Sequence, residues 1–183
     1  MSQSILWRGI HARGHEACRL YQVDTEWRLE GTAVFLSDNR PCRLSYLIAC
    51  DSIWNTLSGT VSGWLGNDNV NVELSVDALH QWQMNGVKVP AVNGCVDLDL
   101  NFSPATNLLP IRRLGLAVGE EAEVNAAWLR FPGFELEPLP QVYSRLDEFT
   151  YRYSSDGGKF IRDLTVSDVG FVIDYPGLWQ AEQ

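Results

Sequence analysis

Val70-Asn71-Val72-Glu73-Leu74-Ser75-Val76 alternates apolar and polar side chains without a break. Successive side chains of a β-strand point to opposite faces, so this run predicts a strand with one buried face and one solvated face. The same alternation recurs over residues 27–35, 42–50, 96–102 and 149–153. Antiparallel sheets with one solvated face produce this pattern, and the sequence therefore predicts an all-β, mainly antiparallel fold.

The segments between these runs are rich in turn residues. Asn85-Gly86 lies between two short runs and matches a two-residue type I′ hairpin turn. Further clusters of turn residues occur at 38–41, 66–69 and 154–158. Many short strands with turns roughly every 8–12 residues predict a many-stranded curled sheet or an open barrel.

One stretch, residues 103–115, departs from the alternation. Ser103 can cap a helix and Pro104 can occupy its first position, while Gly115 can end it. Pro110 argues against one uninterrupted regular helix, because proline removes a backbone hydrogen bond and clashes with the preceding turn. The sequence predicts a single short or kinked α-helix near 104–114, and a helical fraction of about a tenth against the usual third.

Length and charge limit the class of protein. The 183 residues carry no repeat or linker and fit one domain spanning 1–183. The net charge of −9 repels phosphate backbones, which disfavours nucleic-acid binding. No window approaches the ~20 apolar residues of a membrane-spanning helix. The N-terminus has no secretory signal pattern, so we expect a cytoplasmic location.

The metal-binding and nucleophilic residue types form no known motif. The four cysteines and three histidines are scattered, with no CxxC pair and no HExxH. GxSxG, P-loop and GxGxxG motifs do not occur either. The sequence therefore gives no reason to expect a metal, a cofactor or a catalytic residue of these designs.

The sequence from Gly94 to Leu114 carries a resemblance to a known family. Gly94-Cys95-Val96-Asp97-Leu98-Asp99-Leu100 followed by Ser103-Pro104-Ala105-Thr106-Asn107-Leu108-Leu109-Pro110-Ile111-Arg112-Arg113-Leu114 resembles the "Putative glycolipid-binding" family, formerly a domain of unknown function. Flanking similarity extends from about Trp7 to Trp179. The resemblance implies an extended antiparallel sheet wrapped around one helix, an acidic pocket for a glycolipid and a homodimer, with no assigned reaction.

Asp97 and Asp99 are the leading site candidates. Their spacing puts both carboxylates on one face of a strand, with backbones roughly 6.5–7 Å apart. Such a pair can accept hydrogen bonds from sugar hydroxyls, hold a divalent cation, or act as acid and base. A solvated polar strand face explains the pattern equally simply. The closeness of Thr106 and Asn107 in the sequence favours a site, since converging polar groups mark binding pockets.

Arg112 and Arg113 offer two alternatives. Either guanidinium can bind a phosphate or carboxylate of a ligand, or can pair with Asp97 or Asp99 in an internal ionic network. Neighbouring residues on a helix diverge by about 100°, so both are not expected to face one ligand. We expect one structural and one site-facing arginine, with a slight preference for Arg112 in the site.

Other candidates come from the resemblance alone. They are the carboxylates Glu16, Asp51 and Asp174 and the aromatic residues Trp54, Trp82 and Tyr143. Aromatic faces stack on sugars, and carboxylates accept hydrogen bonds from hydroxyl groups. Each also has a structural alternative, as a turn carboxylate or as part of the apolar core.

Three functions remain open from the sequence. The first is a noncatalytic binding or carrier protein for a glycolipid or other sugar-bearing amphipathic ligand. The alternative is a carboxylate-dependent enzyme that acts on a glycoside or related sugar substrate. The third is a homo-oligomeric scaffold in which the polar cluster is structural. A homodimer is expected because open sheet edges need pairing or covering.

Overall fold

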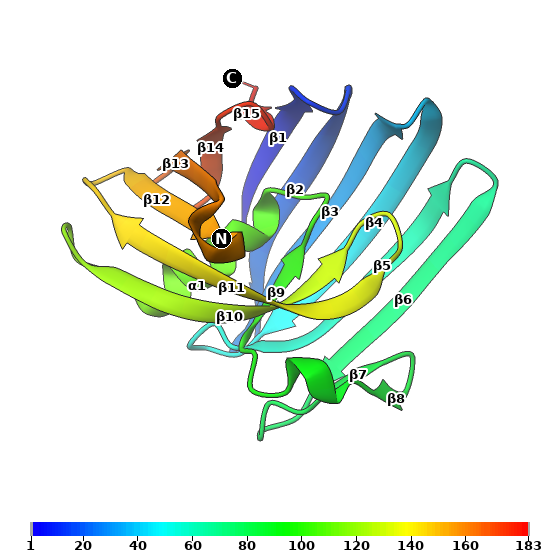
Figure 1. The fold of residues 1–183 in the computed structure, drawn as a ribbon, viewed down its shortest axis with the longest axis horizontal. Helices are drawn as coiled ribbons and strands as arrows, with labels where there is room; N and C mark the ends of the chain where they lie inside the picture. The colour runs from blue at the N-terminus through cyan, green and yellow to red at the C-terminus, as the bar shows by residue number, and fades with distance from the viewer. Residues whose placement is uncertain (1, 183) are drawn as a thin grey trace.

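Fifteen strands form one open sheet in the computed structural model, which describes residues 2–182 (Figure 1). The strands are β1 (Gln3–Gly9), β2 (Gly14–Val23), β3 (Glu26–Ser37), β4 (Arg40–Cys50), β5 (Thr56–Leu65), β6 (Asp68–Val76), β7 (Trp82–Met84), β8 (Val87–Lys88), β9 (Asp97–Leu100), β10 (Glu121–Arg130), β11 (Glu135–Arg145), β12 (Thr150–Ser155), β13 (Phe160–Val166), β14 (Val172–Tyr175) and β15 (Trp179–Ala181). Strands hold 60% of the residues and helices 9%. The predicted all-β class and the low helical fraction are both confirmed.

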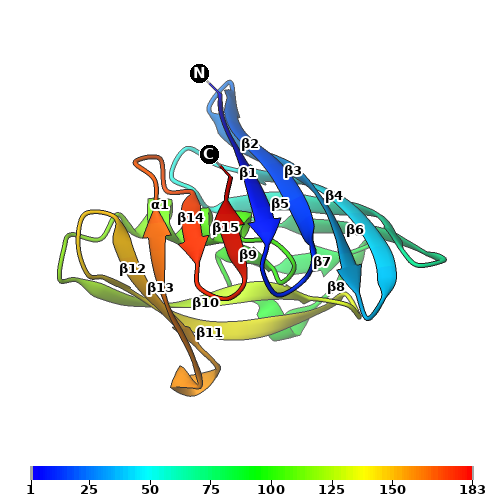
Figure 2. The same cartoon turned by 90° about the horizontal axis from the view of Figure 1, so that it is seen from above.

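The two ends of the chain meet in the middle of the sheet. β1 pairs with β15, and from this pair the sheet continues through β2–β8 on one side and through β14–β9 on the other. All pairings are antiparallel except that of β9 with β10. Figure 2 shows the two arms curling toward each other around the helical segment. The sheet stays open, so the predicted curled sheet describes it and no closed barrel forms.

The edge strand β9 is covered by the rest of the molecule. The Leu98 amide donates to the Thr56 hydroxyl at the start of β5 (3.1 Å), and the Leu100 amide donates to the Thr106 hydroxyl (3.2 Å). The other edge strand, β8, is only two residues long. Short or covered edges do not invite strand addition. The edge argument for a homodimer is therefore weakened, and the homodimer itself stays a prediction.

The alternating runs produce the predicted one-sided burial. In β4, for example, Cys42, Leu44 and Tyr46 are buried and form part of the core, with Arg43 exposed between the first two. Two details differ from the sequence interpretation. β9 is buried on both faces, with Asp97 only 1% exposed, because it lies between β10 and the opposite arm. Phe149 precedes β12 and is 44% exposed.

The Asn85-Gly86 hairpin is confirmed. Both residues have positive φ, 50° and 76°, and they join β7 to β8. Positive φ at both central positions is the requirement of a type I′ turn, and asparagine and glycine meet it at the lowest cost.

The helical segment consists of a 3-10 turn, η2 (Ala105–Asn107), followed by the short helix α1 (Leu108–Leu114). Ser103 accepts the Ala105 amide at 3.1 Å and starts the turn, and Gly115 ends the helix in the left-handed conformation (φ 54°). Pro110 is the third residue of α1, within the first turn, where its missing N–H needs no partner. The α-helix consequently begins later than the predicted 104.

The helix lies between the two arms of the sheet (Figures 1 and 2). Leu108 and Leu109 are fully buried. Helix α1 is too short to span a bilayer, and none of the helices in residues 2–182 is long and apolar enough to do so.

Candidate functional site

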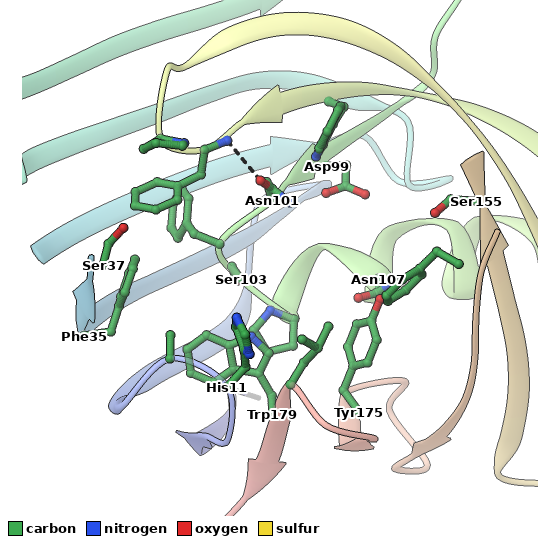
Figure 3. Close-up of a pocket in the computed structure, with 18 of the residues that line it drawn as sticks. His11, Phe35, Ser37, Asp99, Asn101, Ser103, Asn107, Ser155, Tyr175 and Trp179 are labelled. Carbon is green, nitrogen blue, oxygen red and sulfur yellow. Dashed lines mark hydrogen bonds between the residues drawn. The ribbon is translucent and has the colours of Figure 1, made fainter. Parts of the chain in front are cut away.

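A cavity of about 830 Å³ is lined by η2, by residues of β9 to β15 and by the turns that follow β1 and β3 (Figure 3). Its volume lies within the roughly 300–1,000 Å³ of small-molecule sites. Polar and aromatic side chains on one side of the cavity come from β9, η2, β12 and β14; we call Asp99, Asn107, Tyr153, Ser155 and Tyr175 the polar wall. Several of the other lining residues are apolar, and we call five of them the apolar wall: Phe35, Phe102, Phe131, Leu139 and Leu178.

Asp99 is the predicted carboxylate that faces this cavity. Its Oδ2 atom accepts a hydrogen bond of 2.6 Å from Nε2 of Gln141 on β11. Burial raises the pKa of Asp99 to about 6; the Gln141 hydrogen bond opposes this rise and the negative charge of Asp97 adds to it. No lysine or arginine within residues 2–182 forms an ion pair with Asp99.

Asp97 lies on the same strand but is held by the helix. Arg113 binds it with two hydrogen bonds, Nε to Oδ1 at 2.9 Å and the terminal nitrogen to Oδ2 at 2.6 Å. The pKa of Arg113 is raised, mainly by this hydrogen bonding. Asp97 does not line the cavity, so the two carboxylates have different surroundings although their spacing is that of one strand face.

Arg112 lies away from the cavity. Its guanidinium carbon is 5.2 Å from the centre of the Trp54 ring, and Trp54 stacks on Trp27 with centroids 4.6 Å apart. Arg112 also lines a separate hollow of about 330 Å³ together with Arg145 and Asp168. The slight preference for Arg112 in the site therefore has no support in the geometry of the 830 Å³ cavity, and Trp54 does not line that cavity either.

Replacing Arg112 with methionine is expected to lower the free energy of unfolding by only about 0.5–1 kcal/mol, the usual range for an exposed cation–π contact. Methionine keeps much of the side-chain length and removes the charge. Urea denaturation of the Arg112→Met variant measures the loss. A loss of 3 kcal/mol or more would show that the guanidinium compensates a buried charge instead.

The η2 residues Thr106 and Asn107 differ in their relation to the cavity. Asn107 lines the cavity, and its Nδ2 atom donates to the Tyr143 hydroxyl at 2.9 Å. Tyr143 itself is 1% exposed, and burial raises its pKa well above the ordinary value. Thr106 is buried and uses its hydroxyl to accept the Leu100 amide. Asn107 is thus the η2 side chain that is placed to meet a ligand.

Glu16 is fully buried behind the cavity wall. Its Oε1 atom accepts hydrogen bonds from the hydroxyls of Tyr46 and Ser103, both at 2.6 Å, and its Oε2 atom has no partner. Burial raises the pKa of Glu16 to about 7, and the two hydrogen bonds act in the opposite direction. Ser103 lines the cavity, so one hydroxyl separates Glu16 from that space.

The remaining predicted candidates lie elsewhere. Asp51 organises a turn, because its Oδ1 atom accepts the amides of Ile53 and Asn55. The indole of Trp82 is fully buried and donates to the Cys95 carbonyl at 2.9 Å. Asp174 is half-buried on β14 and does not line the cavity. Within residues 2–182, no three His, Cys, Asp or Glu side chains are grouped to hold a metal ion.

Comparison with known proteins agrees with the resemblance in the sequence. The family model described as "Putative glycolipid-binding" matches residues 4–181. The chain belongs to this family. A crystal structure of a DUF1089 family protein from Pseudomonas aeruginosa has the same fold, with a TM-score of 0.78, 35% sequence identity and 90% of each chain covered. No curated protein matches the chain.

Several residues of the polar wall in this glycolipid-binding family member were missed by sequence reasoning. Tyr153, Phe160 and Tyr175 line the cavity as a group, with ring centroids 5.9–6.3 Å apart. Ser155 lines the cavity from β12, and Gln141 on β11, which is not a lining residue, donates a hydrogen bond to Asp99. Tyr153 lies on the apolar face of the alternating run 149–153, which favours a position in the core, and Tyr175 lies outside the alternating runs. One signal was available, since a tyrosine on a buried face brings a hydroxyl that needs a polar neighbour.

Proposed function

We propose that this protein binds a glycolipid or another sugar-bearing amphipathic molecule in the 830 Å³ cavity, through an acidic polar wall. The observation that carries the proposal is the composition of the cavity, which has both a polar wall and an apolar wall in a member of this family. An amphipathic ligand matches such a cavity because each part of the molecule meets surface of its own kind.

The polar wall supplies what a sugar needs. Asp99 offers carboxylate oxygens as acceptors, while Asn107 and Ser155 both donate and accept. Tyr175 presents an aromatic ring beside Asn107 (Figure 3), and rings of this kind pack against sugar faces. The apolar wall, with three phenylalanines and two leucines, is suited to an alkyl chain.

The geometry favours binding over glycoside hydrolysis. The usual hydrolytic mechanism needs two carboxyl groups that flank the scissile bond. Asp97, the partner that the spacing offered to Asp99, has both oxygens bonded to Arg113. The other two carboxylates that line the cavity, Asp38 and Asp156, are exposed. We therefore propose a binding or carrier protein.

Affinity for alkyl glucosides is expected to rise with chain length. Each buried CH₂ group contributes about 0.8 kcal/mol, so decyl glucoside should bind roughly tenfold more tightly than octyl glucoside. Isothermal titration calorimetry below the micelle concentration measures both constants. Free glucose should bind more weakly than either, because it leaves the apolar wall empty.

A cavity-blocking variant provides the control. Ser37 lines the cavity at the end of β3 (Figure 3), so Ser37→Trp should fill part of the space and weaken octyl glucoside binding at least tenfold. Thr25→Trp places the same side chain on the exposed β2–β3 turn and should leave binding unchanged. Absence of binding by every glucoside, or equal binding by both variants, would refute the proposal. Lipid mass spectrometry of protein purified from its native host then identifies the ligand.

A further inference from the structure

Carboxylates predominate among the acidic and basic side chains that line the cavity, with His11 as the basic one. Three carboxylates, Asp38, Asp99 and Asp156, line it, and neither lysine nor arginine is among the lining residues within 2–182. Asp156 has a neighbouring cation, since Lys159 lies 3.5 Å from it at the surface. Asp99 has Gln141 as its hydrogen-bond donor, and this amide carries no charge. Asp99, the least exposed of the three carboxylates, thus has no ion pair with a lysine or arginine within residues 2–182.

Aromatic rings line the same cavity as this carboxylate. Tyr153, Phe160 and Tyr175 are packed against one another with interplanar angles of 57–72°. Tyr153 and Tyr175 line the same cavity as Asp99. Burial is the main cause of the raised pKa values of the two phenols, and the negative charge of Asp99 adds to both. Because the rings pack directly on one another, a ligand group meets their cavity-facing surfaces and does not enter between them.

A carboxylate next to aromatic faces is an arrangement that attracts an organic cation. The carboxylate contributes a charge-assisted hydrogen bond, and a ring face attracts a cation within about 6 Å of its centre. A neutral sugar satisfies the hydrogen-bonding groups of the wall but leaves the buried negative charge of Asp99 uncompensated, and uncompensated buried charge is costly. A positively charged headgroup removes that cost.

We infer that the ligand's headgroup is an amino sugar whose protonated amine lies between Asp99 and the rings of Tyr153 and Tyr175. The inference rests on the proposed function and names its ligand class. The hydroxyls of the sugar remain available to Asn107 and Ser155. The guanidinium carbon of Arg162 is 4.6 Å from the centre of the Phe160 ring. Because this positive charge repels a second cation at Phe160, the amine lies beside Tyr153 and Tyr175.

Three octyl glycosides of equal chain length test the inference at pH 7. They are octyl 2-amino-2-deoxyglucoside, its N-acetyl derivative and octyl glucoside, each titrated by calorimetry. We expect the amine to bind about tenfold more tightly than both neutral compounds, the effect of one favourable charged contact of about 1.4 kcal/mol. In Asp99→Asn the three affinities should fall within about twofold of one another.

A charge-matched variant separates the local contact from the overall charge. Asp24 lies in the exposed β2–β3 turn outside the cavity, and Asp24→Asn removes the same charge as Asp99→Asn. The preference for the amine should persist in Asp24→Asn. Thermal unfolding establishes first that each variant is folded, and the comparison of the three glycosides on the unmodified protein does not depend on any variant.

The outcomes are distinct. If the neutral glycosides bind as tightly as the amine, or if the preference survives Asp99→Asn, the inference is wrong while the proposed function stands. If none of the three glycosides binds, the proposed function is wrong, and the inference is wrong with it.

Discussion

Replacing Arg113 with methionine is expected to lower the free energy of unfolding by about 3–5 kcal/mol, the usual cost of removing one partner from a buried ion pair. The Asp97 side chain is 2% exposed, and both of its oxygens are bonded to Arg113. Without the guanidinium, the carboxylate stays in the interior with no countercharge and without these two hydrogen bonds. Urea denaturation at pH 7 measures the loss.

An exposed ion pair of similar geometry supplies the control. Arg152 binds Asp163 with two hydrogen bonds of 2.8 and 3.0 Å, but both side chains are about half exposed. Arg152→Met should therefore cost about 1 kcal/mol or less. Adding Asp97→Leu to Arg113→Met removes the stranded charge and should restore part of the stability. Equal losses in the two arginine variants would contradict the view that burial makes the Asp97–Arg113 pair important.

The stability of the protein is expected to fall as the pH rises from about 4.5 to 7, because of Glu16. Its pKa is about 7 in the folded protein against an ordinary value of 4.5, so the folded state binds this proton more tightly than the unfolded state does. Between these pH values deprotonation penalises the folded state, by roughly 3 kcal/mol in total. Above pH 7 the penalty is complete.

The Glu16→Gln variant tests whether Glu16 causes this decline in stability. Glutamine cannot ionise, and its carbonyl can still accept the hydroxyls of Tyr46 and Ser103. The variant should lose the Glu16 part of the decline in unfolding free energy between about pH 4.5 and 7, and this loss should be clearest between about pH 6 and 7, measured by urea denaturation across the pH range. Asp99 has a pKa raised to about 6, so the decline in unfolding free energy that it causes lies at lower pH, between about 4 and 6. Asp99→Asn should remove the decline caused by Asp99. A decline between about pH 6 and 7 that persists in Glu16→Gln would rule out Glu16 as its source.

Local patterns accounted for the secondary structure. The alternation in residues 42–50 and 70–76 became β4 and β6 with the apolar side chains inward, because the pleat of a strand imposes that period on any sequence. Asn85-Gly86 formed its hairpin turn and Gly115 ended its helix, since both depend on φ values that few other residues adopt. These features need no information beyond a few neighbouring residues.

Local patterns could not assign the long-range contacts. The spacing of Asp97 and Asp99 gives the two carboxylates the same strand face, but it does not say which meets an arginine and which meets a cavity. Nor does helical geometry, which separates Arg112 from Arg113 by about 100°, say which of them points at β9.

The sequence by itself determined the strands, the hairpin turn, the helix end and, through its resemblance, the family. The tertiary structure decided that Arg113 binds Asp97, that Gln141 binds Asp99, and that Tyr153 and Tyr175 face a cavity. The physical reason is distance along the chain. Backbone conformation responds to adjacent side chains, whereas a contact such as Gln141 with Asp99 joins residues 42 positions apart and forms only when β9, β10 and β11 have assembled side by side in one arm of the sheet.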